Sequence, residues 1–291
     1  MNSRKNATLA GLALLALVLL APLPVLAASA IGSVLLSKGV VTSLSAAGEL
    51  RTLAKKSEVF VKDTITTAQD SFVVIKMIDD TKLTMRPNSE ITLDGYSEEE
   101  GKESATIGLI KGGLRTLTGA IGKKRPEEFR INTAIATIGI RGTDFITRLC
   151  QDKLVDGQIQ NQCASEEQRL ASFQRLAGSP ASRSKKITAS SGEQSRERSS
   201  VECKPVAEIK EGLYVALIEG KINIASKSEE VDIEAVSAVF VEQREVVCLD
   251  QVPNFLSLDD YLSDDPGKTI TLFNILQNID DENLQCIVPE G

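Results

Sequence analysis

The sequence contains no histidine and no tryptophan, and aromatic residues make up only 4% of its 291 residues. Without histidine there is no Ser-His-Asp triad, no Cys-His nucleophile and no zinc site of the usual histidine-containing kind. The shortage of aromatic rings counts against a sugar-binding surface, because such sites commonly present rings for stacking. The composition therefore predicts a protein that is not an enzyme and that has neither a metal nor a cofactor site.

Positive charge is also in short supply. The chain has 33 Lys and Arg residues against 40 Asp and Glu residues, a formal net charge of −7. Removal of the basic N-terminal leader described below would make the mature chain more acidic. Binding to a phosphate backbone requires a basic face, so nucleic acid is excluded as a partner.

The cysteines never form a Cys-x-x-Cys pair, which excludes a zinc knuckle and a thioredoxin-type redox site. All five lie in the second half of the chain, at Cys150, Cys163, Cys203, Cys248 and Cys286. In an oxidising compartment they are candidates for disulfides, and the odd count leaves one thiol free or paired with another chain. A bridge from Cys163 to Cys203 would close the most polar stretch of the chain, but the spacing leaves the connectivity open.

Long apolar runs are missing except at the N-terminus. Arg4 and Lys5 precede an apolar run at residues 9–21, and Pro22 and Pro24 follow it before small residues up to position 30. This order predicts a signal peptide at residues 1–27 and export to the periplasm or beyond the cell. The run is shorter than the roughly 20 residues that span a bilayer, so no transmembrane segment is expected after cleavage. An uncleaved leader acting as a membrane tether is the alternative.

From Gly32 onward the sequence consists of short runs rich in β-branched residues, separated by turn residues. Apolar residues recur five and three positions before, and two positions after, Gly39, Gly112 and Gly220. This weak repeat predicts similar hairpins, each made of a strand, a glycine turn and another strand. Asp79 and Asp80 are expected to form a tight hairpin turn.

The most regular stretch, residues 129–145, alternates apolar and polar residues and ends in Arg141, Gly142, Thr143, Asp144 and Phe145. We expect Gly142 to let the backbone turn, so that the Arg141 guanidinium folds back onto the Asp144 carboxylate. A structural ion pair is the favoured interpretation, and ligand binding by the pair is the alternative.

This pentapeptide resembles the signature of the FecR domain, the sensor module of ferric-citrate-type regulators in bacterial envelopes. Residues 63–67, 78–83, 87–93 and 112–115 follow in the order of that family. Lys62 and Asp80 depart from it, since the family usually has glycine at both positions. The resemblance implies a mainly β domain, a FecR-like β-sandwich or stack of hairpins. It also implies a role like that of sensors that relay the state of an outer-membrane receptor to an anti-sigma factor.

The predicted organisation has five parts. A signal peptide at 1–27 is followed by a FecR-like β domain at 31–151 and an inserted, largely disordered loop at 152–204. Closing hairpins at 205–249 complete the domain, and 250–291 form a small acidic tail with short helices. Within the loop, Ser165 is expected to cap a helix that ends at residue 176, and the Ser-, Arg- and Lys-rich residues 178–200 are expected to be disordered.

The expected function is that of an exported, non-enzymatic binding or sensor-type module whose partner is an envelope protein. No anti-sigma segment is expected before the domain, so a stand-alone form is predicted. Partner binding by addition of a strand to an exposed sheet edge is one possible mode. Two alternatives stay open, namely a module that binds an envelope polysaccharide or cell-wall polymer, and a signalling sensor still tethered by its leader.

Overall fold

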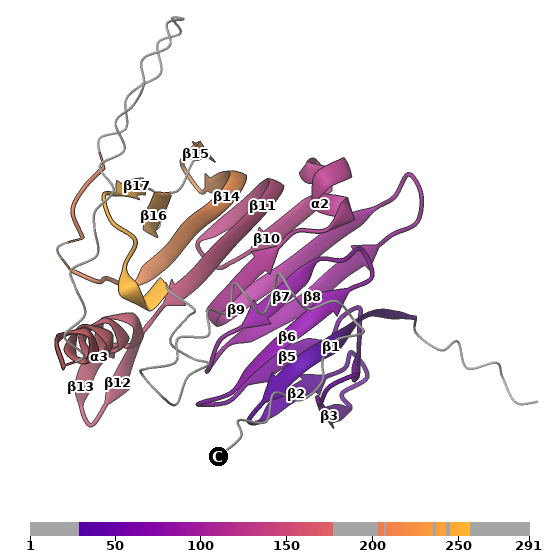
Figure 1. Cartoon of the computed structure of the whole chain (residues 1–291), viewed down its shortest axis with the longest axis horizontal. Coiled ribbons are helices and arrows are strands. Elements are labelled where there is room, and N and C mark those ends of the chain that lie inside the picture. The colour runs from indigo at the N-terminus through magenta and orange to yellow at the C-terminus, as the bar shows by residue number, and fades with distance from the viewer. Residues whose placement is uncertain (1–28, 177–202, 207, 235–236, 243–244, 257–291) are drawn as a thin grey trace, which may run out of the picture.

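The computed structural model describes residues 29–176, 203–206, 208–234, 237–242 and 245–256 (Figure 1). The predicted leader, the predicted disordered stretch at 178–200, most of the acidic tail and Cys286 lie outside these residues. Among the helices that are described, none has the length and apolar character needed to cross a membrane.

One mixed sheet of 15 strands dominates the described chain, so the predicted mainly β class is confirmed. The sheet branches in its first half, where β7, β6, β1 and β4 form one arm and β8, β5, β2 and β3 form the other. The strands of this half are β1 (Ala30–Lys38), β2 (Val41–Leu44), β3 (Leu50–Thr52), β4 (Glu58–Phe60), β5 (Thr64–Thr67), β6 (Phe72–Met77), β7 (Lys82–Met85) and β8 (Glu90–Ser97).

Three long strands connect the arms to the rest of the sheet: β9 (Ser104–Leu117), β11 (Ala136–Cys150) and β14 (Gly212–Ser226). Each changes partners near a glycine with positive φ, namely Gly112 (79°), Gly142 (60°) and Gly220 (91°). In β9, residues up to Lys111 pair with β8, and residues from Gly112 onward pair with β11. The predicted turns at Gly112 and Gly220 are therefore wrong, because the strands bend there and continue.

Short elements fill the gaps between the long strands. Helix α2 (Ala120–Lys124) follows β9, and β10 (Phe129–Asn132) runs parallel to β9 and antiparallel to β11. After β14 the chain forms β15 (Glu230–Glu234), β16 (Ser237–Glu242), β17 (Glu245–Leu249) and the 3-10 helix η2 (Asn254–Leu256).

Two groups of buried residues hold the sheet together. The larger draws side chains from both arms, such as Ile65 and Ile91 from one and Val73 and Ile75 from the other. The two arms therefore pack on one shared core. The smaller group lies around Tyr214, whose ring packs against Phe240 and Phe255.

The predicted insertion is folded over its first part. The strands β12 (Asp152–Val155) and β13 (Gln158–Asn161) form a hairpin, and α3 (Gln162–Leu176) follows directly. Figure 1 shows this hairpin and α3 together at one end of the sheet, with β1 to β3 at the other end. The prediction of a largely disordered loop is therefore wrong for the hairpin at residues 152–161, whereas the helix predicted to end at residue 176 is present.

The helix also begins earlier than predicted. The Asn161 side chain accepts hydrogen bonds from the backbone N–H groups of Cys163 (3.0 Å) and Ala164 (3.1 Å). Asn161 thus provides the N-cap that was assigned to Ser165. Cys163, Glu166 and Leu170 follow one another at spacings of three and four residues, so they share one face of α3, and all three are buried.

Candidate functional site

The pentapeptide Arg141, Gly142, Thr143, Asp144 and Phe145 lies in the middle of β11, where its pairing with β14 is interrupted. Asp144 is buried and receives two hydrogen bonds from Arg115 of β9, at 2.9 Å from Nε and 2.6 Å from Nη2. Arg141 is exposed on the other side of the bend. The predicted Arg141–Asp144 pair is therefore wrong: the carboxylate has a cationic partner, but that partner comes from a neighbouring strand.

The glycines at the bend allow two backbones to approach closely. A Cβ on Gly220 would lie 2.4 Å from the carbonyl oxygen of Gly142. Beside them, the N–H of Thr143 donates to the Thr118 hydroxyl at 2.8 Å, and the N–H of Thr118 donates to the Thr143 carbonyl at 3.0 Å. Thr143, Asp144 and Phe145 are thus buried at the place where β11 contacts β9 and β14. The motif offers no surface on which a ligand could be held by Asp144.

A second set of buried charges links the sheet to α3. Glu166 accepts hydrogen bonds from Arg86 and from Arg148, each at 2.8 Å, and all three side chains are at most 8% exposed. Arg86 also donates to the Phe255 carbonyl at 2.5 Å. Gly113 makes room for both arginines, since a Cβ there would lie 2.7 Å from Arg86 Cδ.

Glu166 neutralises only one of the two cations that it joins. Burial, with the charge of Arg86 adding to it, lowers the pKa of Arg148 to about 10, and Glu166 acts in the opposite direction. Removing one partner from such a buried cluster is costly, because it leaves an uncompensated charge without water. The first part of the insertion is therefore integral to the sheet.

Asp79 forms the third buried polar group, at the turn after β6. Its carboxylate accepts hydrogen bonds from the Tyr96 hydroxyl, from the backbone and hydroxyl of Thr81, and from the N–H of Ile121 in α2. Burial raises the pKa of Tyr96, and the nearby negative charge of Asp79 raises it further. Asp80 adopts the positive φ (67°) of a tight turn, as expected for the position where the family has glycine.

The structure pairs the cysteines differently from the bridge considered above. Disulfides join Cys150 to Cys163 and Cys203 to Cys248. Cys163 cannot pair with Cys203 because the early start of α3 places it against the end of β11. The first bridge fixes the hairpin and α3 to the motif strand, and the second fixes the start of the closing segment to β17.

The β12–β13 hairpin presents apolar side chains to solvent. Leu154 and Ile159 face each other across the two strands and are each 75% exposed, and Val155 is 41% exposed. Positive φ angles at Asp156 (49°) and Gly157 (77°) form the two-residue turn. The Asp-Gly pair between apolar residues is a recognised hairpin signal in sequence, so this element could have been predicted.

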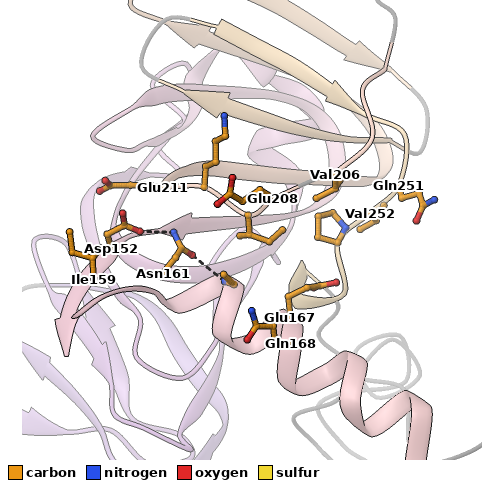
Figure 2. Close-up of a pocket in the computed structure, with 14 residues that line it drawn as sticks. Asp152, Ile159, Asn161, Glu167, Gln168, Val206, Glu208, Glu211, Gln251 and Val252 are labelled. Atoms are coloured by element: carbon orange, nitrogen blue, oxygen red, sulfur yellow. Dashed lines mark hydrogen bonds between the residues drawn. The ribbon is translucent and has the colours of Figure 1, made fainter. Parts of the chain in front are cut away.

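A pocket of about 710 Å³ lies between this hairpin, α3 and the segments on either side of the closing strands. We call it the insertion pocket. Figure 2 shows Asp152 and Glu211 toward one end of it and Val206 and Val252 toward the other, with Glu167 on α3 below. Its lining residues are Asp152, Ile159, Asn161, Ala164, Glu167, Gln168, Val206, Glu208, Ile209, Lys210, Glu211, Gln251, Val252 and Pro253.

These features define a mainly β domain with a buried polar motif. Residues 63–160 match the model of the FecR protein family, in agreement with the resemblance of the sequence. The match begins at Asp63 and ends within β13. The family is regulatory rather than catalytic, and its domains are of the sensor and signal-transduction class.

Comparison with solved structures gives distant similarities. Two crystal structures of a proposed anti-sigma factor from Parabacteroides distasonis align with TM-scores of 0.39 and 0.38, at 9% and 10% identity. Each alignment covers 66% of this chain and 61% of the other chain. A structure described as a cell surface anchoring domain aligns over 21% of this chain and 82% of its own, at 29% identity and a TM-score of 0.21. The comparison with curated proteins found no match.

Proposed function

We propose that the protein is an exported, non-enzymatic sensor-type module that binds another protein of the cell envelope through its β12–β13 hairpin. The observation that carries this proposal is the exposed Leu154–Ile159 pair. A large apolar pair that contributes nothing to the core of its own chain favours an interaction surface. The FecR domain supports a role in signalling, and the N-terminal leader pattern supports export.

The position of the hairpin suits such a role. Its two strands pair only with each other within the described residues, so it projects from the main sheet. The Cys150–Cys163 disulfide and the Glu166 ion pairs fix its base to β11, the motif strand. A partner bound to the hairpin would therefore be held rigidly against the FecR domain.

The polymer-binding alternative loses the residues on which it depended. A sugar-binding surface would need exposed rings, but Tyr96 and Tyr214 are only 8% and 2% exposed. Both hydroxyls are also engaged, with Asp79 and with the backbone of Lys210 respectively. A protein partner is the better-supported proposal.

The test is crosslinking of the native protein in its envelope, followed by mass spectrometry of the captured partner. The double variant Leu154→Lys with Ile159→Lys should abolish the crosslink, since it places two charges on the apolar contact. The double variant Leu44→Lys with Leu50→Lys is the matched control. These leucines also face each other across a hairpin and are 44% and 68% exposed, but they lie at the other end of the sheet (Figure 1). Equal loss with both variants would contradict the proposal.

A further inference from the structure

We propose that the insertion pocket binds a cationic segment of the partner protein, one in which lysine or arginine alternates with apolar residues. This inference rests on the proposed function and specifies the chemistry of the partner. The pocket and the hairpin share Ile159, which lines the pocket and is 75% exposed. A partner that covers the hairpin therefore reaches the pocket without leaving its contact surface.

The net charge of the pocket favours a ligand of the opposite charge. Its lining includes four carboxylates, from Asp152, Glu167, Glu208 and Glu211, and one ammonium group from Lys210, which leaves a formal charge of −3. A concave site lined by one sign of charge attracts ligands of the other sign and speeds their association. A cationic ligand is therefore favoured over a neutral or acidic one.

The carboxylates of the pocket differ in whether they already form hydrogen bonds or ion pairs within the protein. Glu167 accepts hydrogen bonds from the Asn254 side chain at 2.7 Å and from the N–H of Phe255 at 2.8 Å, so it holds η2 in place. Glu208 and Glu211 are exposed, and neither has an ion pair or hydrogen bond with another described residue. These two are the groups that remain free to pair with an incoming cation.

The rest of the lining explains why the ligand should also carry apolar groups. Val206, Ile209 and Pro253 line the pocket, together with Val252, which is 46% exposed. In Figure 2 Val206 and Val252 lie away from Asp152 and Glu211, and Glu208 lies between them, so apolar and acidic groups line the same pocket. A bare inorganic cation would leave the apolar part uncovered, and no group of side chains in the described chain is arranged to hold a metal ion. An extended peptide presents alternate side chains to opposite sides and can reach both parts.

The experiment measures binding of a short fluorescent peptide, in which lysine alternates with valine, to the purified full-length protein by anisotropy. We expect saturable binding that weakens severalfold when the salt is raised from about 0.05 M to about 0.5 M. The double variant Glu208→Lys with Glu211→Lys should weaken binding at least about tenfold, because it replaces attraction by repulsion. Peptides with glutamate in place of lysine, or with serine in place of valine, should bind much more weakly.

The matched control is the double variant Glu49→Lys with Glu230→Lys, which makes the same change of charge at two exposed glutamates outside the pocket. Equal weakening in both variants would show a response to net charge alone and would overturn the proposal. A second result would also overturn the proposal, namely peptide binding that appears only after replacement by serine of Arg183, Lys185, Lys186, Arg196 and Arg198. In that case the chain's own basic segment, and not a partner protein, would occupy the pocket. If the envelope crosslink persists but no peptide binds, the proposed function stands and this inference fails.

Discussion

At the scale of single residues, replacement of a buried carboxylate should reduce the stability of the protein most. Asp144 holds one guanidinium in a bidentate pair, Glu166 holds two, and Asp79 is stabilised by four hydrogen bonds from uncharged donors. Each joins segments that are distant in sequence. The three carboxylates therefore fix the relative positions of strands rather than the conformation of one turn.

The first prediction concerns the partner of Asp144. Replacing Asp144 by asparagine keeps the shape of the side chain but removes the buried negative charge that pairs with Arg115. The free energy of unfolding, measured by urea denaturation, should fall by about 3–5 kcal/mol. Arg141→Ala is the control and should change it by no more than about 0.5 kcal/mol, because Arg141 is exposed. A large loss with Arg141→Ala would instead indicate that Arg141 and Asp144 form the pair.

The second prediction concerns alkaline pH. The pKa of Tyr96 is raised above its ordinary value of 10.0, first by burial and then by Asp79. Below about pH 10 both the folded and the unfolded state keep this proton. Above it the unfolded state releases the proton first, so the contribution of Tyr96 to stability falls as the pH rises.

Comparison with Tyr96→Phe isolates this effect, because Arg148 and Tyr214 titrate in both proteins. The variant should be less stable by about 1–3 kcal/mol at pH 7, since Asp79 loses a hydrogen bond. The difference from the wild type should then shrink as the pH is raised past 10. Urea denaturation across this range measures it, and a difference that stays constant with pH would contradict the assigned shift.

At the scale of secondary-structure elements, the bends of β11 and β14 require glycine for different reasons. Gly220 has no room for a Cβ, which would lie 2.4 Å from the Gly142 carbonyl oxygen. At Gly142 the nearest atom to a Cβ would be Lys123 Cγ at 3.9 Å, so only the φ of 60° opposes a side chain. Alanine at either position tests these two requirements separately.

The third prediction follows from this contrast. Gly142→Ala should reduce the free energy of unfolding by about 1–2 kcal/mol, the usual cost of a left-handed conformation for a residue with a Cβ. Gly220→Ala adds a backbone clash and should cost about 2–4 kcal/mol. Thermal and urea unfolding of the two variants give the comparison. Equal losses would mean that the strands can separate to accept the extra atom.

The strands show how much of this fold can be predicted from sequence patterns. The short β-branched runs noted from Gly32 onward form strands such as β4, β6, β7 and β8, because such runs between turn residues have few alternatives. The long strands β9 and β14 were predicted as hairpins because positive φ at glycine serves a bend and a turn equally well. Only the pairing of neighbouring strands distinguishes the two.

The candidate site shows the same limit. The sequence pattern singled out Asp144 but predicted Arg141, the cation nearest in sequence, as its partner. The actual partner, Arg115, lies 29 residues away in sequence, and the pairing of β9 with β11 brings it next to Asp144. The insertion pocket joins residues from 152 to 253, so no local pattern could define it. The Asp156–Gly157 hairpin was readable from the sequence, yet the polar composition around it favoured a loop.

At the scale of the whole molecule, the disulfides connect the sheet with the two segments that surround the insertion pocket. Cys150–Cys163 closes a loop with a sequence separation of 13, and Cys203–Cys248 closes one of 45. Loop closure of these lengths stabilises a protein by roughly 3 and 4 kcal/mol, respectively. An exported protein gains this stabilisation, whereas the same chain kept in a reducing cytoplasm does not.

The last prediction is that stability depends on the compartment. Unfolding of the purified mature chain should require less urea after reduction with dithiothreitol. The variant with alanine at Cys150 and Cys163 should lose about 3 kcal/mol without reductant, and reduction should then remove only the contribution of Cys203–Cys248. The variant with alanine at Cys203 and Cys248 is the reciprocal control. A version without residues 1–27, retained in the cytoplasm, should resemble the reduced protein in its resistance to proteolysis. If reduction leaves the unfolding midpoint unchanged, the fold does not depend on an oxidising compartment and the argument for export from the cysteines fails.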